Sequence, residues 1–189
     1  MTRARPGVPA TWLLVVVFVA TTIAAAACGA TGPSASPGAS PSAASPGSPG
    51  PRPTPWTGNA VLGIEAMGLA DAEIRKAIND FNAGVQAGDP ALMLEAAKGL
   101  SGVDVLLENV DRIEPFEPMR AFAAAYREAI TLMSSAAKEL RAAIEAGDGP
   151  ATTAASQRLV ESFTKYAEIQ GQLADFVVQV PEQKRLLLR

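Results

Sequence analysis

The apolar residues from Trp56 onward recur every three or four positions, which is the period of an α-helix. The clearest run steps by 3, 4, 4, 3, 4, 3 and 4 residues through Met119, Phe122, Tyr126, Ile130, Met133, Ala137, Leu140 and Ile144. Further runs begin at Ile74, Met93 and Leu159, and the last of them is interrupted by the polar Gln170. Because no useful strand-like alternation appears, the pattern predicts an all-α domain.

Turn residues divide this pattern into four segments. In the stretch AGDP at residues 87–90, the glycine suits the left-handed end of one helix, and the aspartate and proline suit the start of the next. The stretch AGDGP at residues 146–150 repeats this arrangement, and the two prolines of EPFEP at residues 114–118 break the chain between them. We therefore predict helices at about residues 60–87, 90–111, 117–146 and 150–179.

The start of the first helix depends on what the other helices require. Gly63 and Gly68 each oppose a helix by about 1 kcal/mol relative to alanine, and Asp71 would cap a shorter helix well. A helix beginning at Asp71 would leave the apolar stripes of the two longest helices uncovered, so we extend it to include Ile64 and Met67. Short connections make neighbouring helices antiparallel, which predicts an up-down-up-down antiparallel four-helix bundle.

The last nine residues, PEQKRLLLR, follow a different pattern from the helices before them. They start at Pro181 and combine Lys184, Arg185 and Arg189 with three leucines. We expect this tail either to dock on the bundle or to fray, and a partner or lipid contact is the further alternative.

The first 27 residues have the plan of an export signal. Arg3 and Arg5 precede an uncharged and mostly apolar stretch from Trp12 to Ala27, which ends in small residues. That stretch has 16 residues, fewer than the ~20 that a membrane-spanning helix normally needs. We therefore predict a cleaved signal peptide at residues 1–27.

The run Ala25-Ala26-Ala27-Cys28-Gly29 resembles the lipobox of bacterial lipoproteins, in which small residues precede a cysteine and a leucine is usual where Ala25 stands. The resemblance implies that cleavage follows Ala27 and that the thiol of Cys28 carries a diacylglyceryl lipid. The protein would then be held to a bacterial membrane on its extracytoplasmic side, at the cell surface or in the periplasm. A chance cysteine in an ordinary signal or an uncleaved anchor is the alternative.

Residues 28–55 are predicted to be a disordered, lipid-anchored linker. From Gly29 to Pro55 the chain contains eight Pro, six Ser, five Gly, five Ala, two Thr and one charged residue. Because no large apolar side chain is available for burial, nothing offsets the entropy of ordering this segment. Its reach would be roughly 80 Å if fully extended and ~30 Å as a flexible coil. The composition also suits O-glycosylation, although a plain spacer is our preferred interpretation.

The charge and the residue inventory exclude several classes of function. From Trp56 onward 13 basic residues face 19 acidic ones, a balance that argues against a nucleic acid partner. The chain has no histidine, the commonest general base and transition-metal ligand, so we predict neither an enzyme nor a cofactor. The hydroxyls and lysines that we weighed as nucleophiles are Ser134, Ser135, Thr152, Thr153, Lys76, Lys98, Lys138 and Lys165.

Two groups of residues are candidates for a binding site. Asp104, Glu108 and Asp111 have the spacing of one helical face and could bind a hard cation such as calcium, although we favour a solvated acidic face. Tyr126 and Tyr166, with aromatic neighbours at Phe122 and Phe163, could line a ligand cavity, although core filling is the preferred interpretation.

We therefore predict a lipid-anchored extracytoplasmic protein in which residues 56–189 form a helical binding, adaptor or envelope-associated module. A protein of the cell envelope would be its partner. The alternative is a solute- or metal-ion-binding lipoprotein that serves a transporter or a sensor. A polar-lined pocket between helices would favour this alternative, and a closed core would favour an adaptor.

Overall fold

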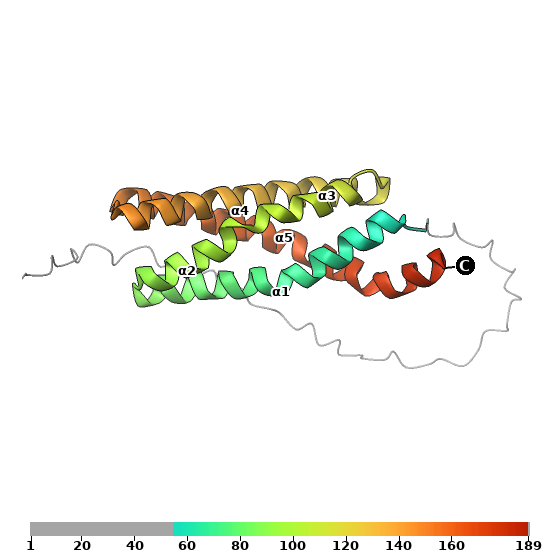
Figure 1. The fold of residues 1–189 in the computed structure, drawn as a ribbon, viewed down its shortest axis with the longest axis horizontal. Coiled ribbons are helices and arrows are strands. Elements are labelled where there is room, and N and C mark those ends of the chain that lie inside the picture. The colour runs from blue at the N-terminus through green and yellow to red at the C-terminus, as the bar shows by residue number, and fades with distance from the viewer. Residues whose placement is uncertain (1–54, 189) are drawn as a thin grey trace, which may run out of the picture. The chain divides into compact units, whose positions relative to one another are not determined.

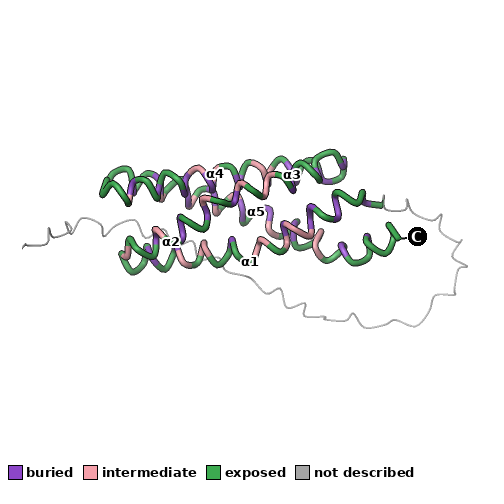
Figure 2. The backbone as a smooth tube through the Cα atoms, in the orientation of Figure 1, coloured by how far each residue is buried: buried purple, intermediate pink, exposed green. Residues whose placement is uncertain are grey.

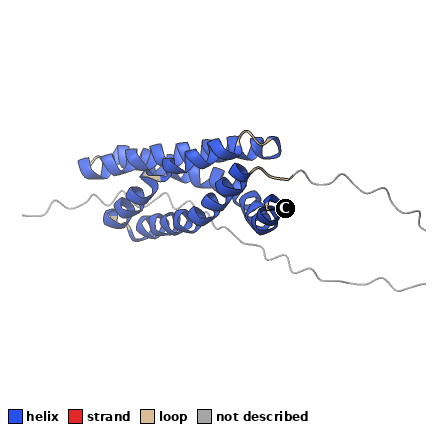
Figure 3. Ribbon diagram, turned by 45° about the vertical axis from the view of Figure 1, so that its right-hand side comes forward, coloured by secondary structure: helices blue, strands red, loops and turns tan. Residues whose placement is uncertain are grey.

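The computed structural model describes residues 55–188, which lie within one compact unit of the chain, residues 55–189. The predicted signal peptide, Cys28 and the linker up to residue 54 lie outside the described residues. Within the described part of the chain, helices and short connections account for the whole structure and no strand is present (Figure 3). The predicted all-α class is confirmed. No helix in residues 55–188 has the length and apolar character needed to cross a membrane.

The first helix, α1, spans Gly58–Ala87 without interruption. The hydroxyl of Thr57 accepts a hydrogen bond from the Ala60 N–H at 3.1 Å, so the helix begins with a side-chain cap. The predicted inclusion of Ile64 and Met67 is confirmed, because both side chains are fully buried in the core. The helix ends at Gly88, whose φ of 62° is the left-handed conformation that glycine adopts without steric cost.

The second predicted helix, residues 90–111, is wrong in its middle. The structure instead has α2 (Pro90–Ser101), the 3₁₀ turn η2 (Val103–Leu106) and α3 (Leu107–Ile113). Gly102 lies at the break between α2 and η2, and glycine is a weak helix former. The Ser101 carbonyl accepts a hydrogen bond from the Ser134 hydroxyl at 2.9 Å, so a neighbouring helix satisfies it.

The remaining helices are α4 (Arg120–Ala146), preceded by the 3₁₀ turn η3 (Glu117–Met119), and α5 (Gly149–Leu187). The predicted end of the last helix at residue 179 is wrong, because α5 continues through Pro181. Its final turns pack on the start of α1, where Gln183 Oε1 accepts the Trp56 N–H at 3.0 Å. Lys184 Nζ also lies 2.6 Å from Glu65 Oε1. The tail therefore docks through its first residues.

Contacts between residues far apart in the sequence join neighbouring helices side by side (Figure 1). Along α1, Gly84 lies against Met93 near one end and Gly63 against Ile113 near the other. The same ordering holds between α4 and α5, and between α1 and α5. The pairs are Glu128 with Lys165, Glu139 with Arg158, Asp71 with Tyr166, and Glu65 with Lys184.

The hydrophobic core follows the predicted apolar stripes. Seven of the eight residues in the run from Met119 to Ile144 are buried and the last is partly buried. In α5 the most buried positions include Ser162 and Ile169, which are one residue before the expected Phe163 and Gln170. Buried and exposed residues therefore alternate along every helix, as expected for amphipathic helices that cover one another (Figure 2).

Replacing Gly63 by alanine should destabilise the domain by about 1–3 kcal/mol. A Cβ at this position would lie 2.7 Å from Ile113 Cγ2 and 2.9 Å from the backbone oxygen of Asn109. Gly171→Ala is the matched control, because no atom lies within 4 Å of its added Cβ. That control should stabilise the domain by about 1 kcal/mol through helix propensity. Urea unfolding measures both, and equal effects of the two substitutions would contradict the close packing at Gly63.

Replacing Gln183 by alanine should lower the free energy of unfolding by about 1–3 kcal/mol, because the buried Trp56 N–H loses its acceptor. Gln179→Ala is the control on the same helix, since this side chain is exposed and bonds only to the Asp175 carbonyl. The control should change stability by less than about 0.5 kcal/mol. If Gln183→Ala behaves like Gln179→Ala in urea unfolding, the tail does not dock as described.

Candidate functional site

The three acidic residues predicted as a weak metal site do not lie on one continuous helix. Asp104 belongs to η2, whereas Glu108 and Asp111 belong to α3. Lys138 pairs with Asp104 at 2.7 Å and lowers its pKa through a hydrogen bond, and Arg127 pairs with Asp111 at 2.7 Å. Within residues 55–188 no three acidic or cysteine side chains gather in a group that could hold a metal ion. Cys28 lies outside these residues.

The hydroxyls and lysines weighed as nucleophiles make structural interactions. The hydroxyls donate to main-chain carbonyls: Ser134 to Ser101, Ser135 to Leu132, Thr152 to Asp148 and Thr153 to Gly149. The lysines form ion pairs: Lys76 with Asp80, Lys98 with Glu95, Lys138 with Asp104 and Lys165 with Glu128. Each of these side chains therefore has a bonding partner within the fold.

A polar cluster joins α1 to α5 in the middle of the domain, and we call Asp71, Arg75, Tyr166 and Gln170 the Asp71 network. Asp71 Oδ1 accepts from the Tyr166 hydroxyl at 2.9 Å and from Gln170 Nε2 at 3.1 Å. Its other oxygen pairs with Arg75 at 2.9 Å, and its side chain is 18% exposed. One oxygen therefore accepts two hydrogen bonds from α5 and the other forms an ion pair within α1, so the carboxylate links the two helices.

Tyr126 lies next to the Asp71 network, and its hydroxyl is unusual. Its ring meets the Tyr166 ring edge-on at 6.0 Å between centroids, and both residues are almost completely buried. Among residues 55–188, the Tyr126 oxygen is the one buried side-chain polar atom without a hydrogen-bond partner. Burial raises the pKa of both tyrosines above the usual range of this side chain. The Tyr166 hydroxyl is the polar group beside that of Tyr126, and it lowers the pKa of Tyr126 against the larger effect of burial.

The structure brings the predicted aromatic residues together only in part. Phe122 packs on Tyr126 with centroids 5.7 Å apart, and Phe122 also meets Phe176 edge-on. Phe163 instead contacts Phe81, across the α1–α5 boundary. These edge-to-face contacts are the arrangement of aromatic side chains that fill a core.

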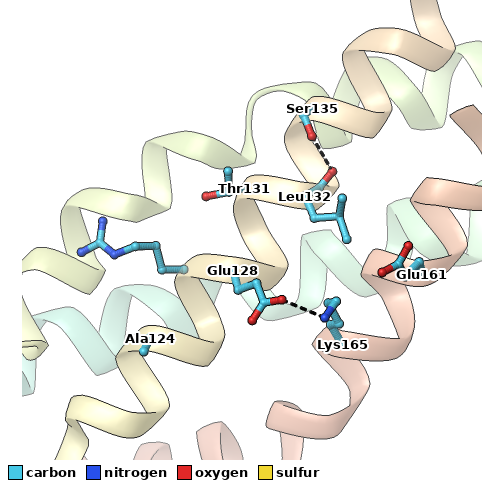
Figure 4. A pocket seen from close by; sticks show the side chains of 8 residues that line it. Ala124, Glu128, Thr131, Leu132, Ser135, Glu161 and Lys165 are labelled. Carbon is cyan, nitrogen blue, oxygen red and sulfur yellow. Dashed lines mark hydrogen bonds and ion pairs between the residues drawn. The ribbon is translucent and has the colours of Figure 1, made fainter.

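A groove between α4 and α5 is wide open to solvent (Figure 4). Its lining residues are Ala124, Arg127, Glu128, Thr131, Leu132, Ser135, Glu161 and Lys165. The ion pair between Lys165 Nζ and Glu128 Oε1, 2.8 Å long, crosses the groove. Another hollow, on α1, is also wide open to solvent. Neither has the enclosed shape that buries most of a small ligand.

Two residues of the Asp71 network carried a signal in the sequence. Gln170 interrupts an apolar run, and the structure explains this break by its bond to Asp71. Asp71 itself was considered only as a helix cap, although it lies inside α1. The pairing of these two residues was missed because 99 positions separate them in the chain.

Removing the two tyrosine hydroxyls should have opposite consequences. Tyr166→Phe removes a donor to Asp71 and should cost about 1–2 kcal/mol of unfolding free energy. Tyr126→Phe removes a buried hydroxyl that has no partner and should be neutral or stabilising. Denaturant unfolding of the two single variants tests this contrast. A loss at Tyr126 equal to that at Tyr166 would mean that the Tyr126 hydroxyl is hydrogen-bonded in the native protein.

No protein-family model, curated protein or solved structure matches the chain.

Proposed function

We propose that the protein is an extracytoplasmic lipoprotein whose helical domain serves as a binding or adaptor module at the cell envelope. The observation that carries the proposal is the run Ala25-Ala26-Ala27-Cys28-Gly29, placed directly after an apolar stretch and directly before a segment rich in proline, serine and glycine. Residues 1–27 would be removed, and the diacylglyceryl group on Cys28 would supply two acyl chains. Stable anchoring generally takes more than one chain.

The proposal assigns the helical domain an up-down-up-down antiparallel four-helix bundle, with α2, η2 and α3 together acting as one helix of the four. Support comes from the two tight connections at Gly88-Asp89 and Gly147-Asp148, and from the antiparallel pairs across the helix boundaries. The linker before Trp56 would be a disordered spacer, since its composition offers no apolar side chains for a core.

A partner protein of the envelope suits this domain better than a small ligand. The polar side chains that could have formed a site are paired with each other, as in the Asp71 network and the pairs of Asp104 and Asp111. The alternative, a solute- or metal-ion-binding lipoprotein for a transporter or sensor, is favoured by one observation. The Tyr126 hydroxyl is buried without a hydrogen-bond partner, and a bound polar ligand would supply one.

Mass spectrometry of the N-terminus tests the anchor. The parent protein, expressed in a bacterium and taken from its membranes, should begin at Cys28 and carry a lipid on the thiol. Cys28→Ser should abolish lipidation and leave the precursor uncleaved. A matched control combines Cys28→Ser with Ser34→Cys, which keeps one thiol in the segment but removes it from the alanine run. An unmodified cysteine in the parent, or lipid on the control, would contradict the proposal.

Affinity capture separates the two roles of the domain. The intact protein is purified from its own membranes under mild conditions, and the proteins and small molecules that remain bound are identified. An adaptor predicts a stoichiometric protein partner, and a solute-binding protein predicts a small molecule whose retention falls in Tyr126→Phe.

A further inference from the structure

One end of the helical domain exposes leucine side chains. Leu186, Leu187 and Leu188 at the end of α5 are 40%, 47% and 89% exposed, and Leu62 on α1 is 53% exposed. In the sequence Leu62 lies between Trp56, just before α1, and Glu65 of α1, and both of these residues contact the last turns of α5. The four leucines therefore lie around the same end of the domain. Single exposed leucines are ordinary on a protein surface, whereas three consecutive ones at the end of α5 concentrate apolar surface in one place.

The chain enters the domain at this same end. Trp56 is buried and its N–H is hydrogen-bonded to Gln183, only three residues before Leu186. Figure 1 shows the start of α1 close to the end of α5. An anchor on the segment before Trp56 would therefore hold the leucine-bearing end of the domain near the anchor.

Two of the three basic residues in the tail, Lys184 and Arg185, lie near acidic side chains. Lys184 is paired with Glu65, and Arg185 follows Glu182 at three positions' distance on an exposed helical surface. An occupant of this surface consequently needs apolar character more than a strong charge of either sign. The hydrocarbon boundary of a lipid bilayer has this character, and leucine-bearing helix segments bind there.

We propose that Leu186, Leu187 and Leu188, with Leu62 beside them, dock on the surface of the membrane that holds the lipid on Cys28. This inference rests on the lipid anchor proposed above. A flexible linker of 27 residues would keep the end of the domain within ~30 Å of the bilayer on average. Such confinement raises the effective concentration of the surface, so a contact too weak to recruit a free protein still forms. The leucine end of the domain would then face the lipid. The opposite end, which carries the α1–α2 connection, would face a partner.

The test attaches the protein to lipid chemically, so that it does not depend on natural lipidation. The chain from Cys28 to Arg189 has one thiol, which couples to a maleimide-bearing lipid in phosphatidylcholine vesicles that contain dibrominated acyl chains. The reporter is Leu187→Trp, and the control is Leu92→Trp at the other end of the domain, where the leucine is 43% exposed. The parent protein, which contains Trp56, gives the background signal.

Bromine should quench the fluorescence of Leu187→Trp at least about two-fold more than that of Leu92→Trp, because only the former residue enters the acyl boundary. Adding Leu186→Ser and Leu188→Ser to the reporter should reduce its quenching to the control level. Equal quenching of the two reporters overturns the proposal. So does a reporter signal that depends on the density of protein on the vesicle, which would assign this end to a second copy of the chain.

The two proposals fail separately in these experiments. If Cys28 proves unmodified in the natural membrane while the coupled reporter is quenched, the lipid anchor is wrong and the membrane-binding end remains. If Cys28 carries lipid and the coupled reporter is not quenched, the anchor stands and the docking of the leucines is wrong.

Discussion

The packing of α1 depends on glycines, at which the helix approaches its neighbours more closely than any side chain would allow. At Gly63 and Gly84 a methyl group would come within 3 Å of backbone atoms of the α2–α3 segment, and at Gly68 it would meet Val177 of α5. Three glycines in one helix cost helix propensity, at about 1 kcal/mol each. The close approach offsets this cost, because α1 can then lie against neighbours on two sides and bury Ile64, Met67 and Phe81 completely.

Charged residues act mainly along the boundaries between helices. The pairs of Lys165 with Glu128, Arg158 with Glu139 and Lys184 with Glu65 each connect two helices at exposed positions. Pairs of this kind contribute about 0–1 kcal/mol each, so they favour the antiparallel register more than they add stability. The consequence for function is that most of the charged groups are already committed to one another. The leucines at the end of α5 are among the large apolar side chains that the packing leaves exposed.

The candidate site could be predicted only in outline. The tyrosines were identified from their helical spacing, and Gln170 was recognised as a polar break. Each of these signals is visible within the sequence of a single helix. Their partner Asp71 lies on another helix, and sequence spacing carries no information about the relative rotation of two helices. The acidic residues 104, 108 and 111 were assigned to one face of a continuous helix, whereas Asp104 lies in the 3₁₀ turn η2 and the other two lie in α3.

The sequence by itself determined the all-α class, the position of both tight connections and the apolar stripes of the helices. These features depend on residues within a few positions of each other: the capping of α2 by Asp89, the left-handed Gly88 and Gly147, and the three-to-four residue period. Only the tertiary structure decided that α5 passes Pro181 and that the chain breaks at Gly102. In both cases the reason is a hydrogen bond to a residue far away in the sequence. Gln183 accepts the Trp56 N–H, which holds the end of α5, and the Ser134 hydroxyl donates to the Ser101 carbonyl at the break.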